Sequence, residues 1–136
     1  MKLFVDTSVW SLALRRDSSA GPEVQRLRDA LIDGELISTT GLVLQELLQG
    51  FRGPKAPALV AERLATTDWV SPTRVDHVEA ADIRNACRRR GVQVGTIGAL
   101  LAQLCISRNL TMLTTDRDFE HVAGLTPLEV WSASGS

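Results

Sequence analysis

Short apolar runs alternate with longer stretches of helical periodicity along the chain. The short runs contain β-prone side chains bounded by turn residues, which is typical of buried strands. These predicted strands cover residues 3–5, 36–38, 69–70, 110–113 and 128–131. In the longer stretches the apolar residues recur at the spacing of an amphipathic helix. These predicted helices cover residues 9–14, 22–33, 41–50, 58–65, 75–90 and 97–107.

The alternation of strands and helices determines the expected architecture. Chains of this kind place parallel strands in one sheet and helices on its faces. We therefore expect an α/β fold, a three-layer sandwich with a central parallel sheet. The domain is expected to span residues 1–131, and residues 132–136 are expected to form a disordered tail.

Acidic residues follow the first and the fourth predicted strands. Asp6 ends the first strand, and Asp116 and Asp118 come just after the fourth. Ligands of open α/β sheets bind beyond the carboxyl ends of the strands, so both places are candidates for a site. The alternative for Asp6 is that it only caps the next helix, because aspartate is a favoured cap.

A third acid, Glu46, projects between Leu42 and Val43 on a helix face that we expect to be buried. Charged groups are rarely buried unless they are paired or bind a metal, so a salt bridge to an arginine is the alternative. The helix starting near Thr96 and the following strand run back along each other for about the same length, which brings the helix start close to Asp116. Carboxylates that converge in this way repel one another unless a cation intervenes, and Mg²⁺ or Mn²⁺ suits oxygen ligands.

The overall composition is that of a globular protein and decides little about nucleic-acid binding. The formal net charge is −1, with 15 basic and 16 acidic residues. The run Arg88–Arg90 at the end of a predicted helix either complements the helix dipole or forms a patch for RNA phosphates. Both alternatives stay open at this point.

Three further expectations concern location and redox state. No apolar run approaches the roughly 18 residues that a membrane span needs, and the first residues lack a signal-peptide pattern. We therefore expect no membrane association and a cytoplasmic protein. Cys87 and Cys105 lie in helical patterns without further metal-ligating neighbours, so we expect reduced, packed thiols.

Four segments together carry a resemblance to a known family. They are Val5-Asp6-Thr7-Ser8, Leu44-Gln45-Glu46-Leu47-Leu48-Gln49-Gly50, Thr96-Ile97-Gly98-Ala99-Leu100-Leu101-Ala102 and Leu113-Thr114-Thr115-Asp116-Arg117-Asp118-Phe119. With these segments the chain resembles a PIN-domain ribonuclease, specifically a VapC-type toxin of a bacterial type II toxin–antitoxin system. The resemblance implies a PIN-like fold and a metal-dependent endoribonuclease acting on tRNA, rRNA or mRNA. It also implies a homodimer silenced by a cognate antitoxin, a protein that packs on the early helices.

The resemblance also implies roles for single residues. Asp6 and Asp116 would hold Mg²⁺ or Mn²⁺, with Asp118 as a reserve ligand. Glu46 would bind the metal or orient the attacking water. The residues that would contact the carboxylates or the substrate phosphate are Ser8, Thr115 and Arg117.

One position departs from the family's pattern. The pattern places a metal-binding aspartate in the first turn of the helix after Thr96, and Gly98 stands there. Glycine is a weak helix former, whereas aspartate favours a helix N-terminus. We interpret Gly98 as a natural loss or a deliberate inactivation, and expect activity to be weakened or absent.

Three other functional classes are alternatives. The first is a non-catalytic PIN-like module that binds the antitoxin or RNA. A phosphoacceptor receiver domain is disfavoured because no lysine follows Lys55, and a haloacid-dehalogenase-type phosphatase because Ser8 stands where it needs a second acid.

The helix that carries Leu44 and Leu48 is apolar nearly all round. One core face does not require so many apolar residues. We expect the surplus, together with residues 59–64, to form an exposed patch that an antitoxin covers.

Overall fold

Five short strands form one parallel sheet in the computed structural model, which describes residues 1–15 and 21–134. The strands are β1 (Leu3–Val5), β2 (Ile37–Thr39), β3 (Asp68–Trp69), β4 (Thr111–Leu113) and β5 (Glu129–Val130). Their order across the sheet is β3-β2-β1-β4-β5, and every neighbouring pair is parallel. The helices are α1 (Thr7–Leu14), α2 (Pro22–Asp33), α3 (Gly41–Gly50), α4 (Ala56–Leu64), α5 (Arg74–Arg89), α6 (Thr96–Ser107) and α7 (Asp118–Ala123).

The central strand β1 explains why the first apolar run is so uniform. Leu3 pairs with Ile37 on one side and with Thr111 on the other, so β1 has no free edge. Because helices cover both faces, all three β1 side chains are fully buried.

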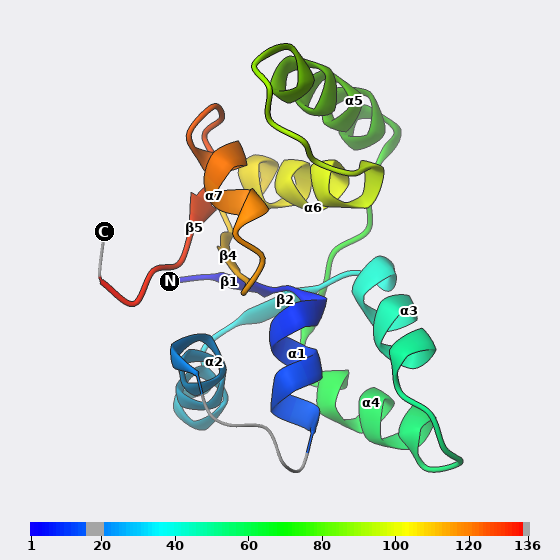
Figure 1. Cartoon of the computed structure of the whole chain (residues 1–136). Coiled ribbons are helices and arrows are strands. Elements are labelled where there is room, and N and C mark those ends of the chain that lie inside the picture. Colours follow the sequence, from blue (N-terminus) through cyan, green and yellow to red (C-terminus); the bar gives the residue numbers. More distant parts are fainter. Residues whose placement is uncertain (16–20, 135–136) are drawn as a thin grey trace.

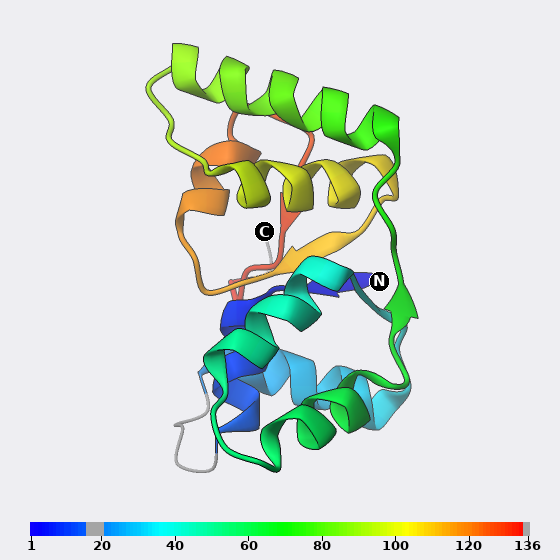
Figure 2. The ribbon, with the colours of Figure 1, turned by 90° about the vertical axis from the view of Figure 1, so that its right-hand side faces the viewer.

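Helices lie on both sides of the sheet, which confirms the expected three-layer sandwich (Figure 1). On one side α6 packs over the sheet, with α5 stacked outside α6 and α7 beside α6 (Figures 1 and 2). On the other side α1 packs against α2 and α3, and α3 packs against α4. The carboxyl ends of β1 and β4 meet at one edge, where α1 begins and α7 follows.

Element boundaries differ from the expected ones mostly at short elements. Helix α1 begins at Thr7 rather than Val9, and β3 covers Asp68–Trp69 rather than residues 69–70. Helix α7 was not expected, because six residues are too few to display a helical period. Of the tail expected at residues 132–136, residues 135–136 lie outside the described part of the chain, and its disorder stays a prediction.

Both cysteines are free and buried, as the sequence predicts. Burial, with a smaller contribution from the charge of Asp6, raises the pKa of the Cys105 thiol, so this residue stays protonated. Among the described helices, none is long and apolar enough to cross a membrane.

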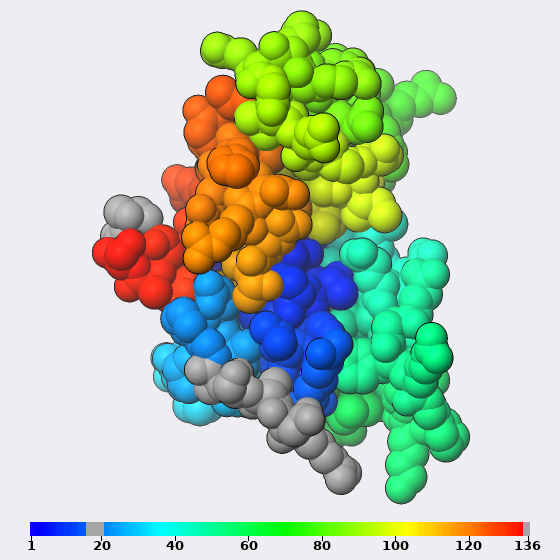
Figure 3. All heavy atoms as spheres, in the orientation of Figure 1, coloured from blue at the N-terminus to red at the C-terminus, as the bar shows by residue number. Residues whose placement is uncertain are grey.

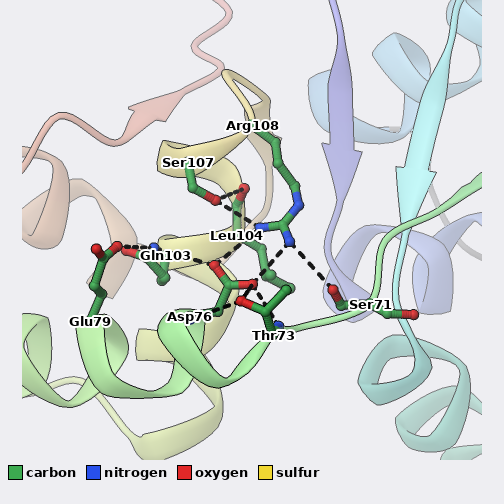
Figure 4. A network of polar contacts seen from close by, with 8 residues as sticks. All are labelled: Ser71, Thr73, Asp76, Glu79, Gln103, Leu104, Ser107 and Arg108. Carbon is green, nitrogen blue, oxygen red and sulfur yellow. Dashed lines mark hydrogen bonds and ion pairs between the residues drawn. The ribbon is translucent and has the colours of Figure 1, made fainter.

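A buried carboxylate fastens the start of α5 to the end of α6 (Figure 4). Asp76 forms a capping box with Thr73, whose backbone N–H lies 2.8 Å from the Asp76 carboxylate. The same carboxylate accepts hydrogen bonds from Arg108 at 2.9 and 3.2 Å and from Gln103 at 3.4 Å. The Arg108 guanidinium holds the pKa of Asp76 far below its usual range, against the opposing effect of burial.

Candidate active site

Asp6 lies at the carboxyl end of β1 and is 8% exposed. It occupies the N-cap position of α1, but its side chain makes no capping hydrogen bond. Instead its Oδ2 accepts hydrogen bonds from Ser8 Oγ at 3.0 Å and from Thr114 Oγ1 at 2.8 Å. Within the described residues Oδ1 has no hydrogen-bond partner, so one carboxylate oxygen is positioned and the other is left for a ligand.

Thr114 links Asp6 to Asp116. Its Oγ1 donates to Asp6 and accepts the backbone N–H of Asp116 at 3.0 Å. Asp116 Oδ1 in turn accepts the backbone N–H of Asp118 at 2.9 Å. Sequence reasoning named the residues around Thr114 but missed this one, although it stands at the carboxyl end of a strand beside Asp116.

Ser8 makes a second connection between the same two loops. Its Oγ donates to Asp6 and accepts the backbone N–H of Thr115 at 3.1 Å. The Ser8 and Thr114 hydroxyls therefore join the start of α1 to the loop after β4. In Figure 3 this loop and α7, in orange, lie against α1, in blue.

Glu46 is half-buried on α3 and accepts a hydrogen bond at Oε1 from Thr7 Oγ1, 3.0 Å away. Thr7 follows Asp6 directly, so Glu46 faces the beginning of α1. The alternative of a salt bridge to an arginine is wrong, because the ion pairs of the described residues are Arg26–Glu35 and Arg108–Asp76.

Gly98 stands in the first turn of α6, where its missing side chain would face the start of α7. A Cβ atom built there would lie 3.1 Å from Val94 Cγ2 and 3.5 Å from Phe119 Cζ. Phe119 directly follows Asp118, so position 98 is oriented towards the segment that leaves β4. The glycine therefore removes a side chain that would point towards Val94 and Phe119.

The remaining candidates lie at the surface and separate into two hollows. Thr115, Asp116 and Arg117 are exposed and line a pocket of about 490 Å³ together with the chain beyond β5. Asp118 is also exposed but lines a different groove, beside arginines of α5. The structure thus connects Asp6 with Asp116, whereas the side chain of Asp118 faces another surface.

The donor set fits a hard cation in kind but is incomplete as placed. Asp6, Glu46 and Asp116 each have one oxygen held by a hydrogen bond from the protein. Across residues 1–15 and 21–134, however, no three His, Cys, Asp or Glu side chains are grouped closely enough to hold a metal ion. The absence of a carboxylate at position 98 is consistent with that.

Comparison with known proteins identifies the family. The model of the PIN domain matches residues 3–125, which is most of the chain. The chain belongs to the PIN domain family. PIN domains are generally nucleases that depend on divalent metal ions. No curated protein matches this PIN domain by sequence.

Several solved structures resemble this PIN domain in fold. VapBC2 from Rickettsia felis, bound to a DNA fragment from their promoter, has 18% identity and a TM-score of 0.76, covering 97% of this chain and 100% of that chain. FitAcB from Neisseria gonorrhoeae has 20% identity and a TM-score of 0.74, covering 97% of each chain. VapC20 from Mycobacterium tuberculosis, a Sarcin-Ricin loop cleaving toxin, has 20% identity and a TM-score of 0.65, covering 87% of this chain and 92% of that chain. The resemblance to the PIN-domain family is thereby confirmed, and the likeness to the VapC-type proteins is a likeness of fold.

Proposed function

We propose that this PIN domain is the toxin of a bacterial type II toxin–antitoxin system, a Mg²⁺- or Mn²⁺-dependent endoribonuclease of the cytoplasm whose activity is weakened by Gly98. The observation that carries the proposal is the hydrogen-bonded connection from Asp6 through Thr114 to Asp116. It joins the Asp6 carboxylate to the backbone of Asp116, and among the described residues no lysine or arginine forms an ion pair with either acid. An arrangement of this kind favours a divalent cation and phosphate chemistry.

The residues at this edge have different proposed roles. Asp6 and Asp116 would hold the metal with oxygens that their positioning hydrogen bonds leave available. Thr7 fixes one oxygen of Glu46, so the other is available to accept a proton from the attacking water. Bound there, Mg²⁺ or Mn²⁺ supplies positive charge that promotes ionisation of water and offsets charge developing on the phosphate.

The exposed loop after β4 provides the contacts to substrate. Arg117 would donate to phosphate oxygens, since a guanidinium offers paired donors that suit phosphate. Thr115 presents a hydroxyl in the same pocket. Asp118, whose side chain lines the other groove, is placed as a reserve metal ligand that requires a change of side-chain orientation.

A second candidate function is a non-catalytic module that binds the antitoxin or RNA. The observation that favours it is Gly98, together with the lack of a metal-binding group among the described residues. RNA cleavage distinguishes the two candidates. The non-catalytic module predicts that no divalent metal produces cleavage by this chain or by any variant at position 98.

Restoring a carboxylate at position 98 tests the proposed function. Gly98→Asp adds a ligand next to the other carboxylates, so we expect tighter Mn²⁺ binding by calorimetry. We also expect cleavage of a structured RNA to rise by at least about 100-fold, the scale of one lost electrostatic contribution to catalysis. Single-turnover cleavage in Mg²⁺ and in Mn²⁺ measures this.

Gly98→Asn is the matched control, because asparagine has nearly the same shape without the charge. It should bind Mn²⁺ no better, and cleave RNA no faster, than the chain with Gly98. Equal metal affinity and equal cleavage for Gly98, Asn and Asp would overturn the proposed function and favour the non-catalytic module.

The proposed antitoxin partner would occupy a groove formed by α1, α4 and the connection between α3 and α4. This groove has a volume of about 550 Å³ and includes Leu14, Phe51 and Leu59. Leu48, on α3, is 40% exposed. An apolar groove on these early helices suits the apolar face of a partner helix.

The proposed homodimer would use a different surface. Ala81 on α5 and Ile97 on α6 border an apolar hollow of about 400 Å³, and Ile97 is 44% exposed. Light scattering that gives the mass of a single chain at micromolar concentration would contradict the dimer.

A further inference from the structure

A groove beside the candidate active site combines two arginines with backbone donors. It lies between the last turns of α5, the segment Val92–Gly95 and the start of α7, and has a volume of about 400 Å³. Arg84 and Arg88 come from α5, and Asp118 comes from α7. The two arginines are four positions apart in the sequence, which places them on one face of the helix.

Neither arginine is neutralised by a carboxylate. Arg84 Nε donates to the backbone oxygen of Val94 at 3.1 Å, which orients the guanidinium along the groove. Arg88 donates to Asn85 Oδ1 at 2.6 Å. In the part of the chain that the structure describes, no ion pair includes either arginine, so the terminal N–H groups of Arg84, and those of Arg88 that do not contact Asn85, are available to an anion.

The beginning of α6 adds a second favourable feature for anions. Gly95 is its N-cap and lines the groove, and no side chain caps the helix. The N-terminus of this twelve-residue helix carries a partial positive charge and adjoins the groove at Gly95. Arginine and helix N-terminus together match the chemistry of phosphate.

The groove reaches the surroundings of position 98. Val94 lines the groove and also lies 3.1 Å from the Cβ position of residue 98. Asp118 lines the groove, and the Phe119 ring next to it lies 3.5 Å from the same position. A strand lying in the groove would therefore pass beside the missing ligand.

We infer that this groove, through Arg84 and Arg88, binds the phosphate backbone of single-stranded RNA and leads it to the acidic residues. The inference rests on the proposed function for the identity of the ligand. It adds residues to that function, because the arginines lie outside the hydrogen-bonded acidic cluster. Such contacts position the strand and do not read its sequence.

RNA binding without cleavage tests the groove. A fluorescently labelled single-stranded RNA is titrated with the chain as it stands, in a metal chelator, and anisotropy is recorded at several salt concentrations. Arg84→Gln with Arg88→Gln should weaken binding by at least about tenfold. The slope of log K against log salt should fall by roughly 1.4, since each phosphate contact to a single strand contributes about 0.7.

Arg89→Gln with Arg90→Gln is the matched control. Both residues are exposed and lie at the same helix end, but they do not line the groove. Replacing them removes the same amount of charge as replacing the groove pair. We expect less than about a twofold loss of RNA affinity for this pair. Arg88→Gln alone should show part of the loss of RNA affinity. Because this substitution breaks no contact to another element, its effect cannot be attributed to misfolding, as that of the Arg84 variant could.

Two outcomes would overturn the RNA-binding role proposed for the groove. One is an equal loss of RNA affinity for both arginine pairs, or no RNA binding at all. The other is competition by poly-glutamate as effective as competition by RNA at equal charge, which would assign the groove to an acidic protein segment.

These experiments distinguish failure of the groove proposal from failure of the proposed function. If Gly98→Asp cleaves RNA but the two arginine pairs have equal effects on binding, only the groove is wrong. If Gly98→Asp does not cleave while the groove pair alone weakens RNA binding, the groove stands and the nuclease proposal falls.

Discussion

At position 98, two effects of opposite sign act on the stability of the fold. Alanine favours a helix over glycine by about 1 kcal/mol, but its Cβ would lie 3.1 Å from Val94 Cγ2. Crowding in a packed region costs a similar amount, about 1 kcal/mol. We expect Gly98→Ala to change the free energy of unfolding by less than about 0.5 kcal/mol, and to stabilise by about 1 kcal/mol when Val94→Ala is also present. Urea denaturation of the four variants measures this, and equal effects in both backgrounds would contradict it.

Single residues at the site were predictable to different degrees. Asp6 and Asp116 follow strands, and a parallel sheet brings strand ends together, so their proximity is inferable from chain order. The roles of Thr7 and Thr114 are not, because a hydroxyl finds its partner only when distant segments have packed. Glu46 shows the same limit: its helix face was predictable, but its bond to Thr7 was not.

At the scale of elements, the attachment of α5 to α6 depends on Asp76. Replacing it by asparagine removes the charge from two hydrogen bonds to Arg108, and charge-assisted bonds contribute about 1.5–3 kcal/mol. We expect Asp76→Asn to lower the free energy of unfolding by about 2 kcal/mol at pH 7, measured by urea denaturation. Asp82→Asn removes an exposed charge from the same helix and should change it little.

The pH dependence of the same variant has a definite sign. The pKa of Asp76 is lowered in the folded protein, so its stabilisation is complete above its unfolded value of about 3.9. Below that pH the unfolded chain takes up a proton that the folded protein does not, and the stabilisation declines. The difference between the unmodified chain and Asp76→Asn should therefore narrow below pH 4 and stay constant between pH 6 and 8. A constant difference down to pH 2 would contradict the assignment.

The elements most completely predicted are those with the clearest pattern. The continuous apolar run of β1 indicates a strand that is buried on both faces. The helical period of apolar residues in α5 indicates a helix that is buried on one face. Helix α7 was missed because tertiary packing of Phe119 and Val122, both buried, stabilises a helix too short to show a period. The predicted position of β3 differs from the observed one by one residue, because both side chains of this strand are exposed and leave no clear apolar pattern.

At the scale of the whole molecule, the groove proposed for the antitoxin is lined by none of the residues of the hydrogen-bonded acidic cluster. Leu59→Arg places a charge in the groove without touching the hydrogen-bonded acids. We expect this variant to reduce co-purification with the proposed antitoxin partner by at least about tenfold, since an unpaired charge in an apolar contact costs several kcal/mol. Gly98→Asp combined with Leu59→Arg should cleave RNA as Gly98→Asp does, and retained co-purification would contradict the assigned surface.

The sheet also has a consequence for how copies of the chain behave when crowded. Its outer strands, β3 and β5, contain two residues each, so either edge offers little unpaired backbone to a neighbouring molecule. Each edge strand also carries an exposed acid, Asp68 on one and Glu129 on the other. Two edges of like charge repel, and short charged edges are poor templates for strand addition. The strongly apolar strands that form the core are thus shielded from edge-to-edge aggregation by the least apolar strands of the sheet.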